Sequence, residues 1–169
     1  MDGHPSEPDG FRDFVEARSS ALLRSGWLLT GDWPSAEDLV QTALAAAWPR
    51  WTTLTRQDAP ELYVRKIMVN TFLRWRRRHW NGEIATGRLP EMQAYGDAFA
   101  QIDARQALIA ALDRLPARQR AVVVLRYFAD QTEAQTAAAM GCSEGSVKTH
   151  CSRAVHALAE VLKAKGITL

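Results

Sequence analysis

Apolar residues recur with a helical period along most of this chain, and the alternating pattern that is typical of β-strands is absent. The pattern predicts helices over residues 11–29, 34–48, 60–80, 105–115, 116–128, 132–140 and 143–158. A loop is expected at 49–59. From 81 to 103 the period is lost among glycines and a proline, as is typical of a linker. The predicted fold class is therefore all-α, with two small helical domains joined by a flexible linker.

This division gives four segments. We expect an unstructured start over residues 1–10, a first domain over 11–80, a linker over 81–103 and a second domain over 104–166. A linker of this length inside one compact domain would be unusual, and the boundary is placed there for that reason.

Residues at the predicted helix ends have capping chemistry. Ser35 and Asp38 have the spacing of a capping box, and so do Thr132 and Gln135. Pro60 is suited to the first position of a helix. Gly141 can end one helix in the left-handed conformation, after which the chain restarts at residue 143.

The last two predicted helices have the spacing of a helix-turn-helix. Their apolar stripe is Met140, Val147, Cys151, Val155 and Leu158. The opposite face of the second helix carries hydroxyl and basic residues: Ser146, Lys148, Thr149, Ser152 and Arg153. In a recognition helix such groups read base edges and hold phosphates in a major groove, so this face predicts duplex DNA as a partner. The alternative at this point is an ordinary αα-hairpin with a solvated polar face.

A second basic element ends the third predicted helix in the sequence RWRRRHW, residues 74–80. Residues 61–88 contain two acidic and seven basic side chains, although the whole chain has a formal charge of only +2. Lys66, Asn70, Arg74 and Arg78 recur every four residues and share one face of the helix. Cations hold phosphates and an amide can bond a base edge, so this face predicts a nucleic-acid site. Trp75 is interpreted as a core residue rather than a stacking platform.

Composition excludes several classes of protein. No apolar run approaches the roughly 20 residues of a membrane helix, and the acidic start differs from a signal sequence, so we expect a cytoplasmic protein without membrane insertion. Cys142 and Cys151 have neither zinc-site nor disulfide-scaffold spacing. The sequence contains no nucleophile and base pair and no phosphate-binding glycine loop. We therefore expect no catalytic residue, no metal and no cofactor, and no enzymatic activity.

With these residues in view, the chain resembles the two-domain bacterial sigma factors of the extracytoplasmic-function group, a branch of the sigma-70 superfamily, and especially the actinobacterial SigE type. Three segments carry the resemblance over residues 11–165: SAEDLVQTALAAAWPRW, ELYVRKIMVNTFLRWRRRH and LPARQRAVVVLRYFADQTEAQTAAAMGCSEGSVKTHCSRAVHAL. Such factors bind core RNA polymerase and promoter DNA and initiate transcription. An anti-sigma protein is a further partner that the resemblance admits.

The resemblance implies roles for single residues. Asp38, Gln41 and Thr42 match positions that face the polymerase clamp, although many members carry an acidic residue where this chain has Thr42. The downstream promoter-binding and melting set is Tyr63, Lys66, Asn70, Arg74, Arg77 and Arg78. The basic pattern supplies the cations of this set. The resemblance matches Tyr63 to an aromatic position near the site of strand opening and Asn70 to a polar residue associated with capturing an extruded base. Residues 52–58 match the family's specificity loop. On the recognition helix, Lys148, Thr149 and Ser152 match positions that read bases or backbone of the upstream element, and Arg153 matches a phosphate position.

Two other functions fit part of the chain. A duplex-binding transcription regulator without a sigma role explains the helix-turn-helix, but it leaves the helix from Asp38 to Trp51 and the block from Arg74 to His79 unexplained. An RNA-binding protein would use the same arginine-rich helix.

Overall fold

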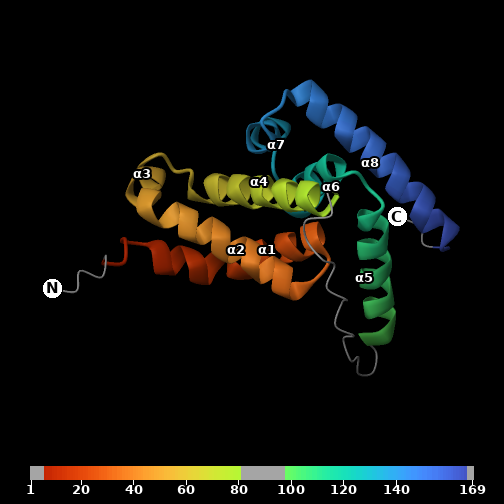
Figure 1. Ribbon diagram of the computed structural model, residues 1–169, viewed down its shortest axis with the longest axis horizontal. Coiled ribbons are helices and arrows are strands. Elements are labelled where there is room, and N and C mark those ends of the chain that lie inside the picture. The colour runs from red at the N-terminus through yellow and green to blue at the C-terminus, as the bar shows by residue number, and fades with distance from the viewer. Residues whose placement is uncertain (1–5, 81–97, 167–169) are drawn as a thin grey trace.

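The computed structural model describes the backbone of residues 6–80 and 98–166 and the side chains of residues 6–78 and 103–166. Every regular element in these residues is helical (Figure 1). The elements are α1 (Phe11–Thr30), α2 (Trp33–Ala47), η1 (Trp48–Arg50), α3 (Trp51–Arg56), α4 (Pro60–Trp80), α5 (Ala98–Asp113), α6 (Ala117–Val123), η2 (Val124–Phe128), α7 (Glu133–Met140) and α8 (Glu144–Ala164). The all-α prediction is confirmed. No helix in the described residues combines the length and apolarity that crossing a membrane requires.

In the first half, α2 packs against both α1 and α4, and the three helices lie side by side in Figure 1. Its core contains the predicted apolar positions of α2 and α4, among them Leu39, Ala43, Val64 and Phe72. The predicted capping box of Ser35 with Asp38 is wrong. Asp32 is the N-cap, and its side chain accepts a hydrogen bond of 2.8 Å from the backbone N–H of Ser35. Both Asp and Ser are good capping residues, and the helix starts at the earlier one.

The segment predicted as a loop at 49–59 is largely helical, because η1 and α3 occupy Trp48–Arg56. Trp51 explains the difference, since its side chain is 2% exposed and its ring packs against Phe11 and Phe14. Its indole Nε1 also donates to the carbonyl of Asp9 at 3.1 Å. A large buried aromatic stabilises local structure that propensity alone does not predict.

In the second half, α5 begins at Ala98, before the start at Arg105 that the pattern predicts. Most of the predicted linker, residues 81–97, lies outside the described residues. The helix predicted to run through Phe128 is regular only as far as Val123 and continues as a π-helical turn, η2. Such turns are frequent at functional sites. Here the turn leaves Tyr127 and Phe128 exposed.

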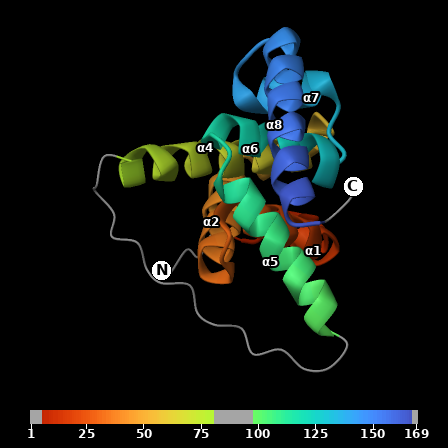
Figure 2. The ribbon, with the colours of Figure 1, turned by 90° about the vertical axis from the view of Figure 1, so that its right-hand side faces the viewer.

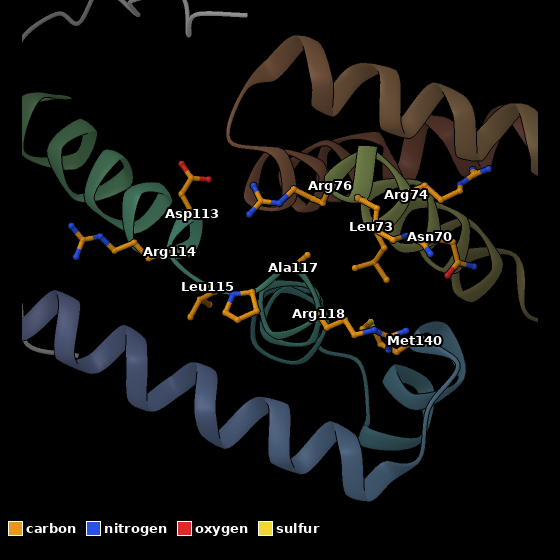
Figure 3. A pocket seen from close by; sticks show the side chains of 12 residues that line it. Asn70, Leu73, Arg74, Arg76, Asp113, Arg114, Leu115, Ala117, Arg118 and Met140 are labelled. Atoms are coloured by element: carbon orange, nitrogen blue, oxygen red, sulfur yellow. The ribbon is translucent and has the colours of Figure 1, made fainter. Parts of the chain in front are cut away.

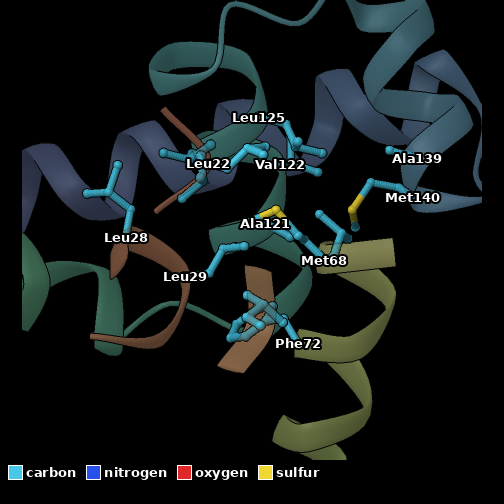
Figure 4. Packing of buried hydrophobic residues seen from close by; sticks show 14 of the residues in the cluster. Leu22, Leu28, Leu29, Met68, Phe72, Ala121, Val122, Leu125, Ala139 and Met140 are labelled. Carbon is cyan, nitrogen blue, oxygen red and sulfur yellow. The ribbon is translucent and has the colours of Figure 1, made fainter. Parts of the chain in front are cut away.

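The two halves pack against each other through one continuous apolar cluster. Figure 4 shows Met68 of the first half near Ala121 and Met140 of the second, with Phe72 further along α4. Helix α7 packs on α4, and η2 packs on α1. Helix α8 packs on α5, α6 and α7 and runs along the outer side of the second half (Figures 1 and 2).

Candidate nucleic-acid and polymerase interfaces

Local hydrogen bonds cap the starts of α7 and α8, as the sequence predicts. The Thr132 side chain accepts from the backbone N–H of Gln135 at 3.1 Å, and the Gln135 side chain accepts from the Thr132 N–H at 2.9 Å. Gly141 ends α7 with φ 65°, in the left-handed region where glycine meets no steric cost. The Ser143 hydroxyl then accepts from the Ser146 N–H at 3.1 Å and starts α8. The Gly141 conformation and the Ser143 cap together set the direction in which α8 leaves the turn.

The buried face of α8 holds this helix on the rest of the second half. Val147, Ala154, Leu158 and Leu162 are buried. Two members of the predicted stripe differ: Cys151 is half-buried against the core, and Val155 is 38% exposed. The prediction is wrong for Val155. The residues of α8 that pack on the core follow one another at intervals of three or four positions and include Ala154, so the next side chain, Val155, points away from the contact.

The opposite face of α8 is open to solvent. Lys148, Thr149, Ser152 and Arg153 are exposed, and Ser146 is half-buried. These groups make few contacts among the described residues. Lys148 Nζ lies 3.5 Å from Glu133 Oε2 of α7, the Thr149 hydroxyl donates to the Gly145 carbonyl at 3.1 Å, and the Ser146 hydroxyl accepts from the Ser143 hydroxyl at 3.0 Å. A salt bridge between exposed groups is weak, so Lys148 is free to exchange Glu133 for a phosphate or a base edge. The structure thus brings all five predicted upstream residues onto neighbouring turns of one helix.

Two titrating side chains lie at the edges of this face. Burial, Arg118 and Arg153 lower the pKa of His150 below its ordinary value. Burial also raises the pKa of the Cys151 thiol, and Arg126 partly opposes this effect. Cys151 is therefore a protonated, packed thiol rather than a reactive one, which agrees with its predicted role as a small apolar residue.

Helix α4 separates a buried face from a basic face. Val64, Met68, Val69 and Phe72 are buried on one side. On the other side the predicted row is present: Lys66, Arg74, Arg77 and Arg78 are exposed, and Tyr63 and Asn70 are half-buried. Trp75 packs against the core, as interpreted. The side chains of His79 and Trp80, the last two residues of the RWRRRHW block, lie outside the described residues.

Asn70 lies at the edge of a cleft between the two halves. The cleft has a volume of about 940 Å³. Its α4 wall includes Asn70, Leu73 and Arg77, and its other wall includes Arg118 and Met140. Figure 3 shows Asn70 and Leu73 facing the same space as Arg118 and Met140. Asn70 therefore shares this cleft with residues from the distant half of the chain, a relation that a helical pattern cannot reveal.

The third predicted surface lies on α2. Asp38, Gln41 and Thr42 are exposed, while Leu39, Val40, Ala43 and Leu44 are buried on the opposite side. None of the three exposed side chains makes a hydrogen bond or ion pair within the described residues. The row is therefore available to a protein partner.

Sequence reasoning missed two buried arginines. Arg65 is 4% exposed, and it donates to Glu61 Oε1 and to the Ser25 hydroxyl at 2.9 Å each. Arg120 is fully buried, donates through Nε to the Leu28 carbonyl at 2.7 Å, and pairs with Asp113. The Glu61 and Arg65 spacing of four residues is a signal that could have indicated the first pair. No sequence signal links Arg120 to a partner 92 positions away.

Comparison with known proteins matches both halves. The family model described as Sigma-70 region 2 matches residues 14–82, and the model described as Sigma-70, region 4 matches residues 105–158. The chain is 40% identical to the RNA polymerase sigma-E factor of Streptomyces coelicolor, over 93% of this chain and 88% of that one. It is 30% identical to the ECF RNA polymerase sigma factor SigL of Mycobacterium tuberculosis, over 93% of this chain and 91% of that one.

A solved structure is also similar in fold. It is the sigma factor RpoE in complex with the anti-sigma factor NepR from Bartonella quintana. The TM-score is 0.74 at 25% identity, and the match covers 92% of this chain and 98% of that chain. The similarity extends over both halves and is not confined to the helix-turn-helix.

Proposed function

The chain belongs to the extracytoplasmic-function group of the sigma-70 family, and from that premise we propose how its three surfaces share the work of transcription initiation. As a sigma factor it binds core RNA polymerase and directs promoter recognition and strand opening. The regulator that would act without a sigma role is not favoured, because the matched segments include the first half of the chain. Each of these steps is assigned to residues on one surface.

The first domain, residues 11–80, docks on polymerase through α2. Asp38 and Gln41 supply a carboxylate and an amide on an exposed helix face, with Thr42 beside them. The opposite face of α2 is apolar and buried, which supports this assignment. That face holds the helix in place, so the exposed side chains are not needed for packing and can contact a partner. The contact is electrostatic and amide-based, so it would favour a basic surface on the partner.

The same domain captures the melted strand through α4. Lys66, Arg74, Arg77 and Arg78 hold phosphates, and Asn70 bonds the edge of an extruded base. Tyr63 provides a half-buried ring near the start of the row, where a base can stack. One observation carries the proposal: a single amide interrupts an otherwise cationic row, and an amide contributes base recognition where a cation contributes phosphate affinity.

The second domain, residues 104–166, grips the upstream duplex through α8, with Lys148, Thr149 and Ser152 toward base edges and Ser146 and Arg153 toward the backbone. Residues 81–103 link the domains. All these steps are binding steps, so we assign no catalytic residue and no cofactor. The site of action is the cytoplasm, where the polymerase is. An anti-sigma protein belongs among the partners, since the similar RpoE structure is a complex with one.

Promoter-specific initiation in vitro tests this function. Core polymerase from the source cell is combined with the purified protein and genomic promoter fragments, and transcript 5′ ends are mapped. We expect discrete start sites that core polymerase alone does not produce. The same pattern of 5′ ends with and without the protein would refute the proposal.

The docking surface has its own test. Replacing Asp38 and Gln41 by Ala should weaken co-purification with polymerase and leave the melting temperature nearly unchanged. A matched control replaces Asp103 and Gln106, two exposed residues of α5 with the same residue types and spacing, by Ala. Equal loss in both variants would show a general charge effect, and wild-type affinity in the α2 variant would remove α2 from the interface.

A further inference from the structure

The start of α7 places a carboxylate beside the exposed face of α8. Glu133 is the first residue of α7, and its Oε2 lies 3.5 Å from Lys148 Nζ on α8. The carboxylate also acts on Cys151: burial raises the pKa of this thiol, Arg126 opposes the rise, and Glu133 adds to it. Cys151 lies about one turn after Lys148 on α8. Glu133 therefore faces the border between the packed side of α8 and its exposed side.

Stability does not explain this position of the carboxylate. The side chains of Lys148 and Glu133 are 66% and 36% exposed, and an ion pair this open to water is screened and weak. A carboxylate in the first turn of a helix also interacts favourably with the helix dipole. An acidic residue anywhere in that turn would serve this role. The dipole therefore gives no reason for Glu133 to lie against Lys148.

The charge of Glu133 is unfavourable for phosphate binding by its neighbour. In a helix-turn-helix the first helix crosses the phosphate backbone while the second enters the groove. With α8 in the groove, Glu133 at the start of α7 would face a dense row of negative phosphates. A phosphate held by Lys148 would lie within one Debye length of Glu133, roughly 8 Å at physiological salt, so the two anions would repel each other.

A base edge meets much less of this repulsion. Acceptors such as guanine O6 and N7 carry no formal charge, and a lysine can donate three hydrogen bonds. One N–H of Lys148 can therefore stay with Glu133 while another reaches a base. The same carboxylate opposes one use of Lys148, the phosphate contact, and is compatible with the other, the base contact. Specificity is a difference of affinities, and it rises when the unwanted complex is made less favourable.

We propose that Glu133 is a positioning residue for upstream promoter recognition, which holds the Lys148 ammonium toward base edges and away from the phosphate backbone. Its effect is to lower the affinity for DNA in general and to raise the preference for the upstream element. This inference rests on the proposed function, because Lys148 is assigned to base edges there.

Binding of the full chain to two duplexes tests this role. One duplex carries the upstream element of a promoter from the initiation assay, and in the other duplex that element is scrambled. Glu133→Gln keeps the size of the side chain and removes its charge. This variant should bind the scrambled duplex about two- to five-fold more tightly than wild type does, which is the range of an exposed charge pair. Its affinity for the intact element should stay nearly the same, so its preference for the element should fall by a similar factor.

Salt dependence and two controls separate this role from a general loss of negative charge. The log-log salt slope of Glu133→Gln on the scrambled duplex should steepen by about 0.9, since Lys148 gains a phosphate contact. Glu160→Gln makes the same change at an exposed site further along α8 and should alter neither slope nor preference. In a chain that also carries Lys148→Ala, the Glu133 change should likewise alter neither. A carboxylate that only stabilises α7 would change the melting temperature of the chain but not these two DNA measurements.

Several results would overturn the inference. An equal gain on both duplexes with an unchanged slope would mean that Glu133 only repels DNA. The same loss of preference with and without Lys148 would mean that Glu133 acts through another group. Weaker binding to the intact element, without a gain on the scrambled one, would mean that the carboxylate itself contacts a base.

The proposed function can fail separately from this inference. If Lys148→Ala alone keeps the full preference for the element, Lys148 does not read bases, and both the assignment of α8 and the role of Glu133 are wrong. If Lys148→Ala lowers the preference and Glu133→Gln leaves it unchanged, only the positioning role of Glu133 is removed.

Discussion

Helices α4 and α8 are both 21 residues long, and each has one buried face and one polar face, yet they differ in what lies opposite the polar side chains. The polar face of α8 is open, and only Glu133 pairs with one of its cations among the described residues. The face of α4 adjoins a cleft shared with the other half of the chain. Amphipathic pattern thus predicts which side chains point outward, whereas tertiary packing decides which of them are accessible.

The largest effect should come from the buried side of α4. Phe72→Ala removes a ring that is 2% exposed from the shared cluster and should lower the free energy of unfolding by about 3–5 kcal/mol. Asn70→Ala, on the polar side of the same helix, should change it by less than about 0.5 kcal/mol. Urea titration followed by circular dichroism measures both. Similar losses for the two variants would contradict the separation of faces.

The basic row should produce the next largest effect. Replacing Arg74, Arg77 and Arg78 by Ala should reduce the log-log salt slope for single-stranded promoter DNA by about two units, since each lost phosphate contact removes about 0.7. The matched control removes three exposed arginines elsewhere: Arg24, Arg50 and Arg105. A smaller slope for the α4 variant than for the control variant supports phosphate contacts at α4. If the two triple variants have the same slope, the α4 arginines are merely solvated.

On α8, substitution of Lys148 or Ser152 by Ala should cost about 1–3 kcal/mol of discrimination between upstream promoter sequences. The reason is loss of a base contact while the buried face is unchanged. Competition binding against a library of upstream duplexes measures the discrimination. Lys163→Ala, an exposed change further along the same helix, should leave sequence preference intact. An equal loss of discrimination in Lys163→Ala would indicate that the effect comes from lost positive charge and not from a base contact.

A smaller effect is expected at the start of the helix-turn-helix. Thr132→Ala deletes the side chain that accepts from the Gln135 N–H, which should destabilise the chain by about 1 kcal/mol. Thermal unfolding measures the change, with Thr52→Ala on α3 as the control at an exposed threonine. If both substitutions have the same effect, the cap contributes nothing.

The smallest effect concerns pH. The pKa of His150 is lowered by burial and by Arg118 and Arg153, so the unfolded chain takes up this proton near 6.5 while the folded chain resists it. The contribution to stability is present above pH 6.5 and is lost as pH falls toward the folded pKa. His150→Gln should flatten the dependence of the urea midpoint on pH in that range, and His156→Gln should preserve it. A flat wild-type profile would be inconsistent with this environment.

Features whose partners are near in sequence could be predicted. The Thr132 and Gln135 box and the Ser143 cap each join residues three apart, so the chain specifies them locally. Local rules were ambiguous where two capping residues competed, and Asp32 rather than Ser35 starts α2. Periodicity located the faces of α2, α4 and α8, but it misplaced Val155 by one position.

Features that depend on distant partners could not be predicted. Trp51 is buried by Phe11 and Phe14, and its burial turns an expected loop into helix. In the sequence Arg120 is one more cation beside an apolar run, and its partner Leu28 lies in another helix. The position of Asn70 at a cleft has the same origin, because Met140 on the other wall of the cleft belongs to the other half.

The central claim is that strand capture and upstream binding reside on separate halves of this sigma factor. The most direct measurement combines upstream footprinting with permanganate reactivity of melted thymines on the same holoenzyme and promoter complexes. Asn70→Ala should keep the upstream footprint and lose thymine reactivity, while Lys148→Ala should weaken the footprint first. Loss of the footprint in Asn70→Ala, or loss of melting alone in Lys148→Ala, would contradict the account.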